Sequence, residues 1–412
     1  AGDSITLPEF YSKRFHDRKN IVSTVAALII MVFFCVYVGS CFVTCGKLFA
    51  TLFGLDYATM MVLGAIIVFL YTLVGGYLSV VTTDFVQGVL MFFALATVFV
   101  GSVAWAGGVD NTVAFLQNIP GFLSGTQIAV PLVDDAGRQL VENGTPLFGD
   151  AAEYPLITIA SMLAWGLGYF GQPHILVRFM GISSPAAIKK SRRIATVWVV
   201  ISLTAAVMIG VSGRMVLGDG LLDGNGQQEI IYITMVSKFF PLFIAGIFLS
   251  AILAAIMSTA DSQLLVTASA PTKDFYHNKI RPQATEKELM WVSRGCVMGV
   301  AVIAVLIATN QNSTVLGLVS YAWGGFGSAF GPLVLCSLFW KRTNKQGAYA
   351  GILVGGIVDL VWAQLSGGIF DLYEIVPGFV CGLIAIFVVS LLTAAPSKEI
   401  TDEFDSYRSC EE

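Results

Sequence analysis

The stretch WGLGYFGQPH, from Trp165 to His174, decides how the chain is interpreted, because it interrupts an apolar run long enough to cross a bilayer. Three glycines and Pro173 fall within these ten positions. Glycine weakens a helix and proline removes one of its hydrogen bonds, so the pattern predicts a broken helix. In hydrocarbon, irregular backbone is tolerated only where it is buried in protein or lines a wet cavity. A single glycine or proline would be explained by a kink in the helix. Four helix-breaking residues interleaved with aromatic and polar side chains favour a binding site instead.

The composition around this stretch is that of a polytopic membrane protein. Hydrophobic residues make up 56% of the 412 residues and charged residues 12%, and the mean hydropathy is +0.78, far outside the soluble globular range. Apolar stretches of about 20 residues, the length that a helix needs to cross roughly 30 Å of hydrocarbon, occur ten times. The sequence therefore predicts an all-α fold with ten membrane spans. The predicted spans are 21–46, 57–76, 80–106, 155–180, 194–217, 240–269, 290–309, 315–340, 347–366 and 374–394.

The distribution of Lys and Arg gives the predicted topology. If the N-terminus and the connections that follow the even-numbered spans lie in the cytoplasm, 19 of the 23 Lys and Arg residues are cytoplasmic. Such an excess is expected, because Lys and Arg are concentrated in the cytoplasmic loops of membrane proteins. The outside set is Lys47, Arg138, Arg214 and Lys238. We therefore expect residues 1–20 and the acidic tail, 395–412, to be cytoplasmic, the tail as a disordered segment. Residues 107–154 form an extracytoplasmic loop, either a plain polar loop or a small hairpin or gate. The seven cysteines lie in apolar runs or in the tail, so we expect free thiols.

The sixth span contains AILAAIMSTADSQLL, from Ala251 to Leu265. Ala255, Ser258, Thr259 and Ser262 stand at i, i+3, i+4 and i+7, on one helical face. Hydroxyl and carbonyl oxygens suit a hard cation such as sodium. Small and hydroxylated residues are also ordinary packing material between membrane helices. The residues alone leave both interpretations open.

Three aspartates fall within predicted spans, where carboxylates are costly to bury and are by default functional hypotheses. Asp84 lies about one turn into the third span, where it either complements the helix dipole or takes part in function. Asp261 lies three residues after Ser258, and we expect a local structural role for Asp359. The three histidines are far apart, and neither a metal-binding spacing nor a nucleophile motif is found, so the chain is not expected to be an enzyme.

Five stretches, in order and at matching spacing, resemble the sodium:solute symporter family, most closely its members that carry proline. They are WGLGYFGQPHILVRFM, GGYLSVVTTDFVQG, AILAAIMSTADSQLLV, VLGLVSYAWGGFGSAFGP and LYEIVPGF. The resemblance, from about Leu7 to about Pro396, implies two five-helix repeats of opposite topology that enclose sodium and substrate near mid-membrane. It also implies sodium-coupled uptake of L-proline by alternating access across the bacterial cytoplasmic membrane, with the lipid bilayer and no nucleic acid as partner. The alternatives are a symporter of the same fold for another amino acid or small carboxylate, and a membrane sensor module, for which the short tail leaves no catalytic domain.

By the same resemblance, residues 21–106 correspond to the last three helices of the first repeat and residues 155–340 to the complete second repeat. Residues 341–394 correspond to two accessory helices. The first two helices of the first repeat have no counterpart in the chain. We therefore expect it to be part of a longer protein and not competent for transport alone.

The resemblance also assigns site residues. It places sodium at the Ala255 carbonyl and at the hydroxyls of Ser258 and Thr259, with Asp84, Asp261 and Ser262 in ion coupling. The family's proline carriers tend to have a small neutral residue where this chain has Asp261. The substrate residues implied are Tyr37, Trp165, Tyr169, Pro173, Tyr321, Trp323 and Phe326. Aromatic faces suit a zwitterion with an apolar ring, since a cation–π contact with its ammonium contributes about 0.5 to 2 kcal/mol. Aromatic residues at helical spacing also commonly serve only for packing.

Overall fold

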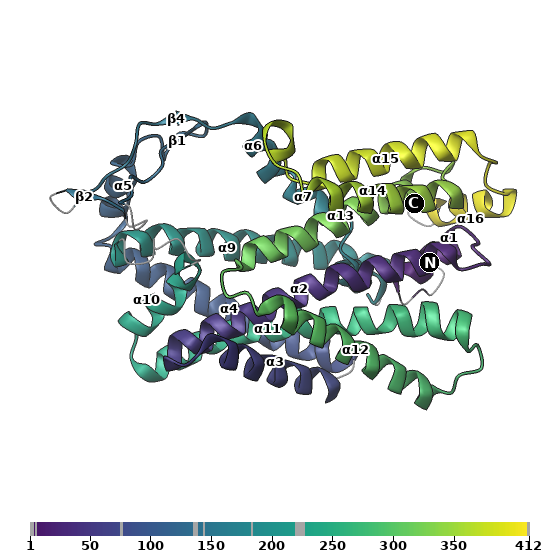
Figure 1. The fold of residues 1–412 in the computed structure, drawn as a ribbon, viewed down its shortest axis with the longest axis horizontal. Helices are drawn as coiled ribbons and strands as arrows, with labels where there is room; N and C mark the ends of the chain where they lie inside the picture. The colour runs from purple at the N-terminus through teal and green to yellow at the C-terminus, as the bar shows by residue number, and fades with distance from the viewer. Residues whose placement is uncertain are drawn as a thin grey trace.

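The computed structural model describes residues 4, 6–74, 77–134, 139–142, 145–182, 184–218 and 227–409. Its long helices lie roughly along one direction and form a bundle (Figure 1). They are α2 (Ile21–Phe53), α3 (Tyr57–Val74), α4 (Tyr77–Trp105), α9 (Pro185–Leu217), α11 (Leu242–Ser269), α12 (Glu286–Ala308), α13 (Val315–Phe339), α14 (Lys345–Trp362) and α15 (Ile375–Leu392). The shorter helices are α1 (Leu7–Arg14), α5 (Val109–Gln117), α6 (Leu156–Leu163), α7 (Trp165–Gly168), α8 (Pro173–Met180), α10 (Ile231–Phe239) and α16 (Lys398–Ser409). Two 3-10 turns, η1 (Gln227–Ile230) and η3 (Gly368–Asp371), and a π-helical segment, η2 (Ala270–Ile280), complete the helical part.

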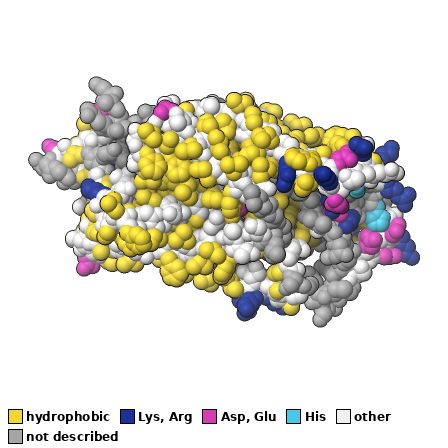
Figure 2. All heavy atoms as spheres, turned by 90° about the horizontal axis from the view of Figure 1, so that it is seen from below, with side chains coloured by type: hydrophobic (Ala, Val, Ile, Leu, Met, Phe, Trp, Pro, Cys, Tyr) yellow, Lys and Arg dark blue, Asp and Glu magenta, His cyan; other side chains and the backbone are white. Residues whose placement is uncertain are grey.

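The all-α membrane architecture is confirmed at the level of its helices. Among the described residues, seven helices are long and apolar enough to cross a bilayer. The predicted spans 57–76, 155–180 and 347–366 correspond to α3, to the interrupted α6–α8 and to the 18-residue α14, which are not among those seven. In Figure 2 apolar side chains cover the middle of the visible face, and most of its charged side chains lie toward the ends. The number of ten spans stays a prediction.

The interior is built around α2 and α13, which pack against each other (Figure 1). In the most apolar 18-residue stretch of α13, 83% of the stretch is buried inside the protein. Small residues allow this close approach, since a Cβ atom on Gly325 would overlap the ring of Phe33 on α2. Membrane helices associate in this way because lipid is as apolar as their side chains, so the hydrophobic effect does not favour their contact and close packing must stabilise it. A rigid central pair therefore positions the elements around it.

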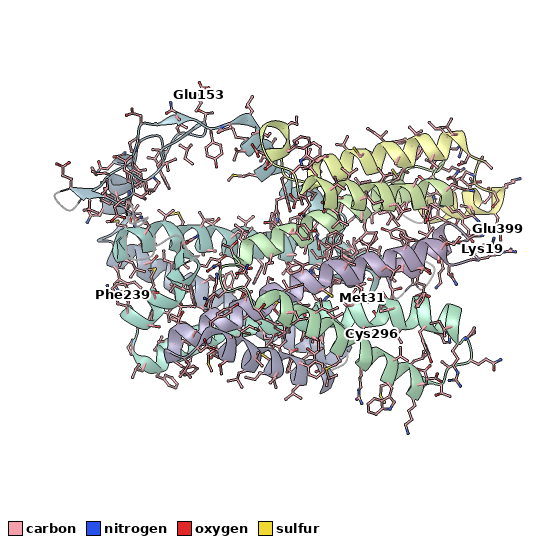
Figure 3. The ribbon with its side chains drawn as sticks, in the orientation of Figure 1. Lys19, Met31, Glu153, Phe239, Cys296 and Glu399 are labelled. Carbon is pink, nitrogen blue, oxygen red and sulfur yellow. The ribbon has the colours of Figure 1, made fainter. Side chains whose placement is uncertain are left out.

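Both described ends of the chain lie at the same end of the bundle. Lys19 and Glu399 lie together there, and Phe239 lies at the opposite end (Figure 3). The expectation of a disordered tail is wrong over residues 398–409, which form α16. This helix docks because Phe404 is buried beneath the Arg14 guanidinium, 4.9 Å from the ring centre, and Glu403 lies 3.0 Å from His16 Nε2.

The predicted loop 107–154 contains α5 and two short antiparallel ribbons rather than a plain coil. Strand β1 (Gln127–Ile128) pairs with β4 (Ala152–Glu153), and β2 (Val141–Glu142) pairs with β3 (Thr145–Pro146). Six cysteines are free thiols, as predicted. Arg138 and Cys410, which also entered the sequence predictions, lie outside the described residues.

Candidate functional site

The predicted break in the fourth span is present between α7 and α8. Helix α7 ends at Gly168, Gln172 has an extended backbone (φ −74°, ψ 110°), and Pro173 opens α8. Proline is well suited to this place, because the first residues of a helix have no intrahelical partner for their N–H groups. The break therefore creates a half-helix that starts in the interior of the bundle.

Two of the three glycines in this stretch allow it to touch α13. A Cβ atom on Gly168 would overlap the Trp323 indole, and one on Gly171 would overlap the Phe326 carbonyl oxygen. A Cβ atom on Gly166 would meet nothing within 4 Å. Close approach to α13 therefore explains two of the glycines, and the third has no such neighbour.

Hydrogen bonds also join helix α13 to the broken stretch. Trp323 Nε1 donates to the Trp165 carbonyl oxygen at 3.0 Å, and Gln172 Nε2 donates to the Trp323 carbonyl oxygen at 3.3 Å. The Trp323 ring stacks on Trp165 with centroids 5.1 Å apart and meets Tyr169 edge-on at 4.9 Å. The exposed fraction is 5% for Trp323 and 0% for Phe326. These two predicted substrate residues are packed in the interior in this conformation.

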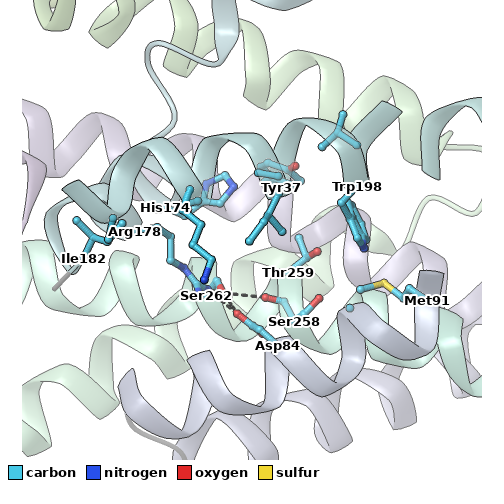
Figure 4. Close-up of a pocket in the computed structure, with 17 residues that line it drawn as sticks. Tyr37, Asp84, Met91, His174, Arg178, Ile182, Trp198, Ser258, Thr259 and Ser262 are labelled. Atoms are coloured by element: carbon cyan, nitrogen blue, oxygen red, sulfur yellow. Dashed lines mark hydrogen bonds and ion pairs between the residues drawn. The ribbon is translucent and has the colours of Figure 1, made fainter. Parts of the chain in front are cut away.

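A cavity of about 820 Å³ lies on the other side of α8, between α2, α4, α9 and α11 (Figure 4). Its lining includes five predicted site residues, namely Tyr37, Asp84, Ser258, Thr259 and Ser262. His174 also lines the cavity, and its ring lies edge-on to Tyr37 at 5.9 Å. The other predicted site residues are not part of this lining, namely Trp165, Tyr169, Pro173, Ala255, Asp261, Tyr321, Trp323 and Phe326. The predicted ion-binding face and Tyr37 therefore meet in one cavity, whereas the aromatic group around the break lies beside it.

The hydroxyl residues Ser258, Thr259 and Ser262 of α11 line this cavity, as the helical spacing predicts. Ser258 Oγ donates to the Ala255 carbonyl oxygen at 3.1 Å, and Ser262 Oγ donates to the Ser258 carbonyl oxygen at 2.8 Å. The Thr259 hydroxyl makes no hydrogen bond within the described part of the chain. Oxygen lone pairs on this face are therefore available to a cation.

Arg178 joins the site, although the sequence placed it only among the cytoplasmic basic residues. Its Nη2 atom lies 2.5 Å from Asp84 Oδ2 and 2.7 Å from Ser262 Oγ (Figure 4). The other Asp84 oxygen, Oδ1, is buried and has no hydrogen-bond partner among the described residues. One signal was available in the sequence, since Arg178 stands one helical turn after His174 on the half-helix that the break creates. The partner, 94 positions away, was not visible.

The other two intramembrane carboxylates differ in their surroundings. Asp261 is fully buried, and neither of its carboxylate oxygens has a hydrogen-bond partner in the described structure. It interacts electrostatically with Asp84 and Arg178. Asp359 is also fully buried but accepts a hydrogen bond from Ser328 Oγ at 2.9 Å, a contact consistent with the local structural role expected for it.

Comparison with known proteins identifies relatives over nearly the whole chain. The model of the sodium:solute symporter family matches residues 2–355. The chain is 43% identical to the high-affinity proline transporter PutP of Bacillus subtilis (strain 168), over 99% of this chain and 81% of that protein. It is 44% identical to the osmoregulated proline transporter OpuE of the same organism (97% and 76%) and 41% identical to the sodium/proline symporter of Escherichia coli (strain K12) (98% and 76%).

One solved structure, described as the substrate-bound outward-open state of a Na+-coupled sialic acid symporter, is similar in fold. Its TM-score is 0.71 at 20% sequence identity, over 95% of this chain and 78% of that chain. At this identity the likeness concerns the fold alone.

Proposed function

Since the chain belongs to the sodium:solute symporter family, we propose that it takes up L-proline together with sodium across the cytoplasmic membrane of a bacterium. The observation that carries this proposal is the identity of 41 to 44%, over nearly the whole chain, to three bacterial proteins named as proline transporters or symporters. The family and these relatives are transporters, which favours a transporter over an enzyme. Sodium is then a co-substrate that enters and leaves with each cycle.

The sodium ion is bound by the Ala255 carbonyl oxygen and the hydroxyl oxygens of Ser258 and Thr259. Three features support this assignment: the residues share one face of α11, Ser258 and Thr259 line the cavity, and the Thr259 hydroxyl has no hydrogen bond among the described residues. Neutral oxygen ligands suit a hard monovalent cation. Asp84 on α4, together with Asp261 and Ser262 on α11, guides the ion on its way through the cavity.

Proline binds between Tyr37 and the break. The half-helix that opens at Pro173 directs backbone N–H groups towards the carboxylate of the zwitterion, since a helix N-terminus attracts negative charge. Aromatic faces from Trp165, Tyr169 and the Tyr321–Phe326 region close over the ring in the occluded state. Trp323 and Phe326 are buried against the break in the present conformation, so they reach substrate only if α13 and the broken helix move apart.

The transport cycle is alternating access in a fold of two inverted repeats, with ten spans and both ends of the chain in the cytoplasm. Residues 21–106 and 155–340 represent the two repeats. The cavity is lined by Ile182 and Lys190, which lie just after α8 and in the second turn of α9, in the connection predicted to be cytoplasmic. We therefore assign the present conformation to the inward-facing side of the cycle. A ligand shifts this equilibrium only if it binds one conformation better than the other.

The available energy is sufficient for accumulation of proline. One charge that crosses about 150 mV yields about 3.5 kcal/mol, and a roughly tenfold sodium gradient adds about 1.4 kcal/mol. Together these sustain a proline gradient above about 1,000-fold for one sodium ion per cycle.

The test is uptake of labelled proline into proteoliposomes that contain the complete gene product. We expect uptake with an inward sodium gradient and less than about a tenth of that rate when choline replaces sodium. Sodium-independent uptake would remove the coupling from the proposal. A competition panel of other amino acids and small carboxylates tests the cargo, because a competitor that inhibits better than proline would replace it as the substrate.

A further inference from the structure

Charged side chains from three different elements lie in or beside the cavity: Asp84 and Arg178 line it, and Asp261 is buried outside its lining. Asp84 comes from α4, Arg178 from α8 and Asp261 from α11. Among the described residues Asp84 and Arg178 form an ion pair, and Asp261 interacts electrostatically with both. With both carboxylates ionised, the formal charge of the three groups is −1. One further monovalent cation would neutralise the cluster.

The position of the Arg178 guanidinium matters more than its charge alone. Its Nη2 atom bridges Asp84 Oδ2 and Ser262 Oγ at 2.5 and 2.7 Å. Ser262 Oγ lies 3.4 Å from Asp84 Oδ2. A hydroxyl oxygen and a carboxylate oxygen at this separation could also bind a small hard cation. A sodium ion on the same two oxygens would lie close to the guanidinium, and two like charges at that separation repel strongly in a partly dehydrated site.

We propose that Arg178 is a tethered cation, which takes the place of sodium on Asp84 and Ser262 when the carrier is empty. This inference rests on the proposed function, because it requires a sodium-coupled cycle. On the way in, sodium displaces the guanidinium from these oxygens. After sodium leaves to the cytoplasm, the guanidinium returns and neutralises Asp84, so that the empty carrier can close around an otherwise uncompensated buried carboxylate.

The proposal distinguishes two modes of transport. Net uptake requires the empty carrier to reorient, and this is the step in which Arg178 replaces sodium. Exchange of external for internal proline, with sodium on both sides, uses only the loaded carrier, in which the sodium ion at Ser258 and Thr259, in the same cavity as Asp84, supplies the compensating positive charge. Loss of the guanidinium should therefore impair net uptake and spare exchange, because a buried unpaired carboxylate is costly only when no cation accompanies it.

The experiment compares Arg178→Gln with the unaltered complete gene product in proteoliposomes. We expect net sodium-driven proline uptake to fall at least tenfold, while exchange keeps at least half of its rate. The sodium concentration for half-maximal exchange should fall about threefold, because the competing cation is gone. Arg192→Gln is the matched control, since Arg192 is an exposed basic residue that does not line the cavity, and its net uptake and sodium dependence should stay within twofold.

Two further variants protect the test against a folding defect. Arg178→Met keeps an unbranched apolar stem without charge and replaces the Gln variant if that variant is not monodisperse after purification. Arg178→Lys retains the positive charge and should show a higher ratio of net uptake to exchange than either neutral variant. Equal losses of net uptake and exchange in a folded neutral variant, an unchanged or raised sodium requirement, or a Lys variant no better than Gln would each overturn the tethered-cation role. If the unaltered protein shows no sodium-driven uptake, the proposed function fails and not this inference alone.

Discussion

The sodium assignment leads to a prediction for Thr259→Val, which replaces the hydroxyl by a methyl group of similar size. The Thr259 hydroxyl lines the cavity and makes no hydrogen bond within the described residues, so its removal should leave the fold unchanged. A polar interaction with a charged group contributes about 1.5 to 3 kcal/mol. The cavity of about 820 Å³ is large enough to hold water, and a water molecule that replaces the hydroxyl recovers part of that energy. We therefore expect a net loss of about 1.4 kcal/mol, a tenfold rise in the sodium concentration for half-maximal uptake.

The assay is the initial rate of proline uptake as a function of external sodium, at a clamped membrane potential and with choline as the replacement cation. Thr267→Val on the same helix is the matched control, because the Thr267 hydroxyl is already bonded to the Gln263 carbonyl oxygen at 2.6 Å. The control should keep the original sodium dependence. A sodium dependence of Thr259→Val within twofold of the original, in protein that is folded and inserted, would refute the placement of sodium on this face.

Gly171→Ala should destabilise the protein by about 1 to 3 kcal/mol in thermal unfolding in detergent, because its Cβ atom would overlap the Phe326 carbonyl oxygen. The control Gly166→Ala, whose Cβ atom would have no neighbour within 4 Å, should unfold within about a degree of the unaltered protein. Equal melting temperatures of the two variants would contradict the packing explanation. Glu229→Gln should lower the free energy of unfolding by about 1 kcal/mol, since the Glu229 carboxylate accepts from two N–H groups at the start of α13 and from a lysine ammonium; an unchanged melting temperature would show that this contact is not stabilising. Asp359→Asn should leave the sodium dependence of uptake within twofold, because its amide can keep the bond from the serine hydroxyl, and a larger change would reveal a role in coupling.

Much of the fold follows from local properties of the sequence. Each apolar run of about 20 residues predicts a helix, because backbone N–H and C=O groups in hydrocarbon must bond to each other, and a helix satisfies them within one segment. The helices match these runs closely except at charged ends, where α9 begins at Pro185 rather than at the predicted residue 194. Hydropathy measures where a helix leaves the hydrocarbon and not where its hydrogen bonds stop. The expectation of a disordered acidic tail is wrong for a related reason, since α16 is stabilised by the burial of Phe404 against Arg14 and not by its own composition.

The ion-binding face could be predicted because a helix has a fixed period. Ser258, Thr259 and Ser262 share a face wherever α11 lies, and their exposure to a common cavity follows once that face is turned inward. The aromatic residues could not be assigned in the same way. Trp323 and Phe326 are at suitable spacing for a pocket, yet both are packed against the broken helix, since periodicity does not say which neighbour covers a face.

The sequence by itself determined that this is an all-α membrane protein, that its fourth span is broken and that α11 has a polar face. All three depend on residues within a few turns of each other. Only the tertiary structure decided that the break packs on α13, and that Arg178, one of the basic residues predicted to be cytoplasmic, pairs with Asp84 beside Ser262. The physical reason is that an ion pair inside a membrane protein is fixed by the packing of helices far apart in sequence, and no local pattern records which charges that packing brings together.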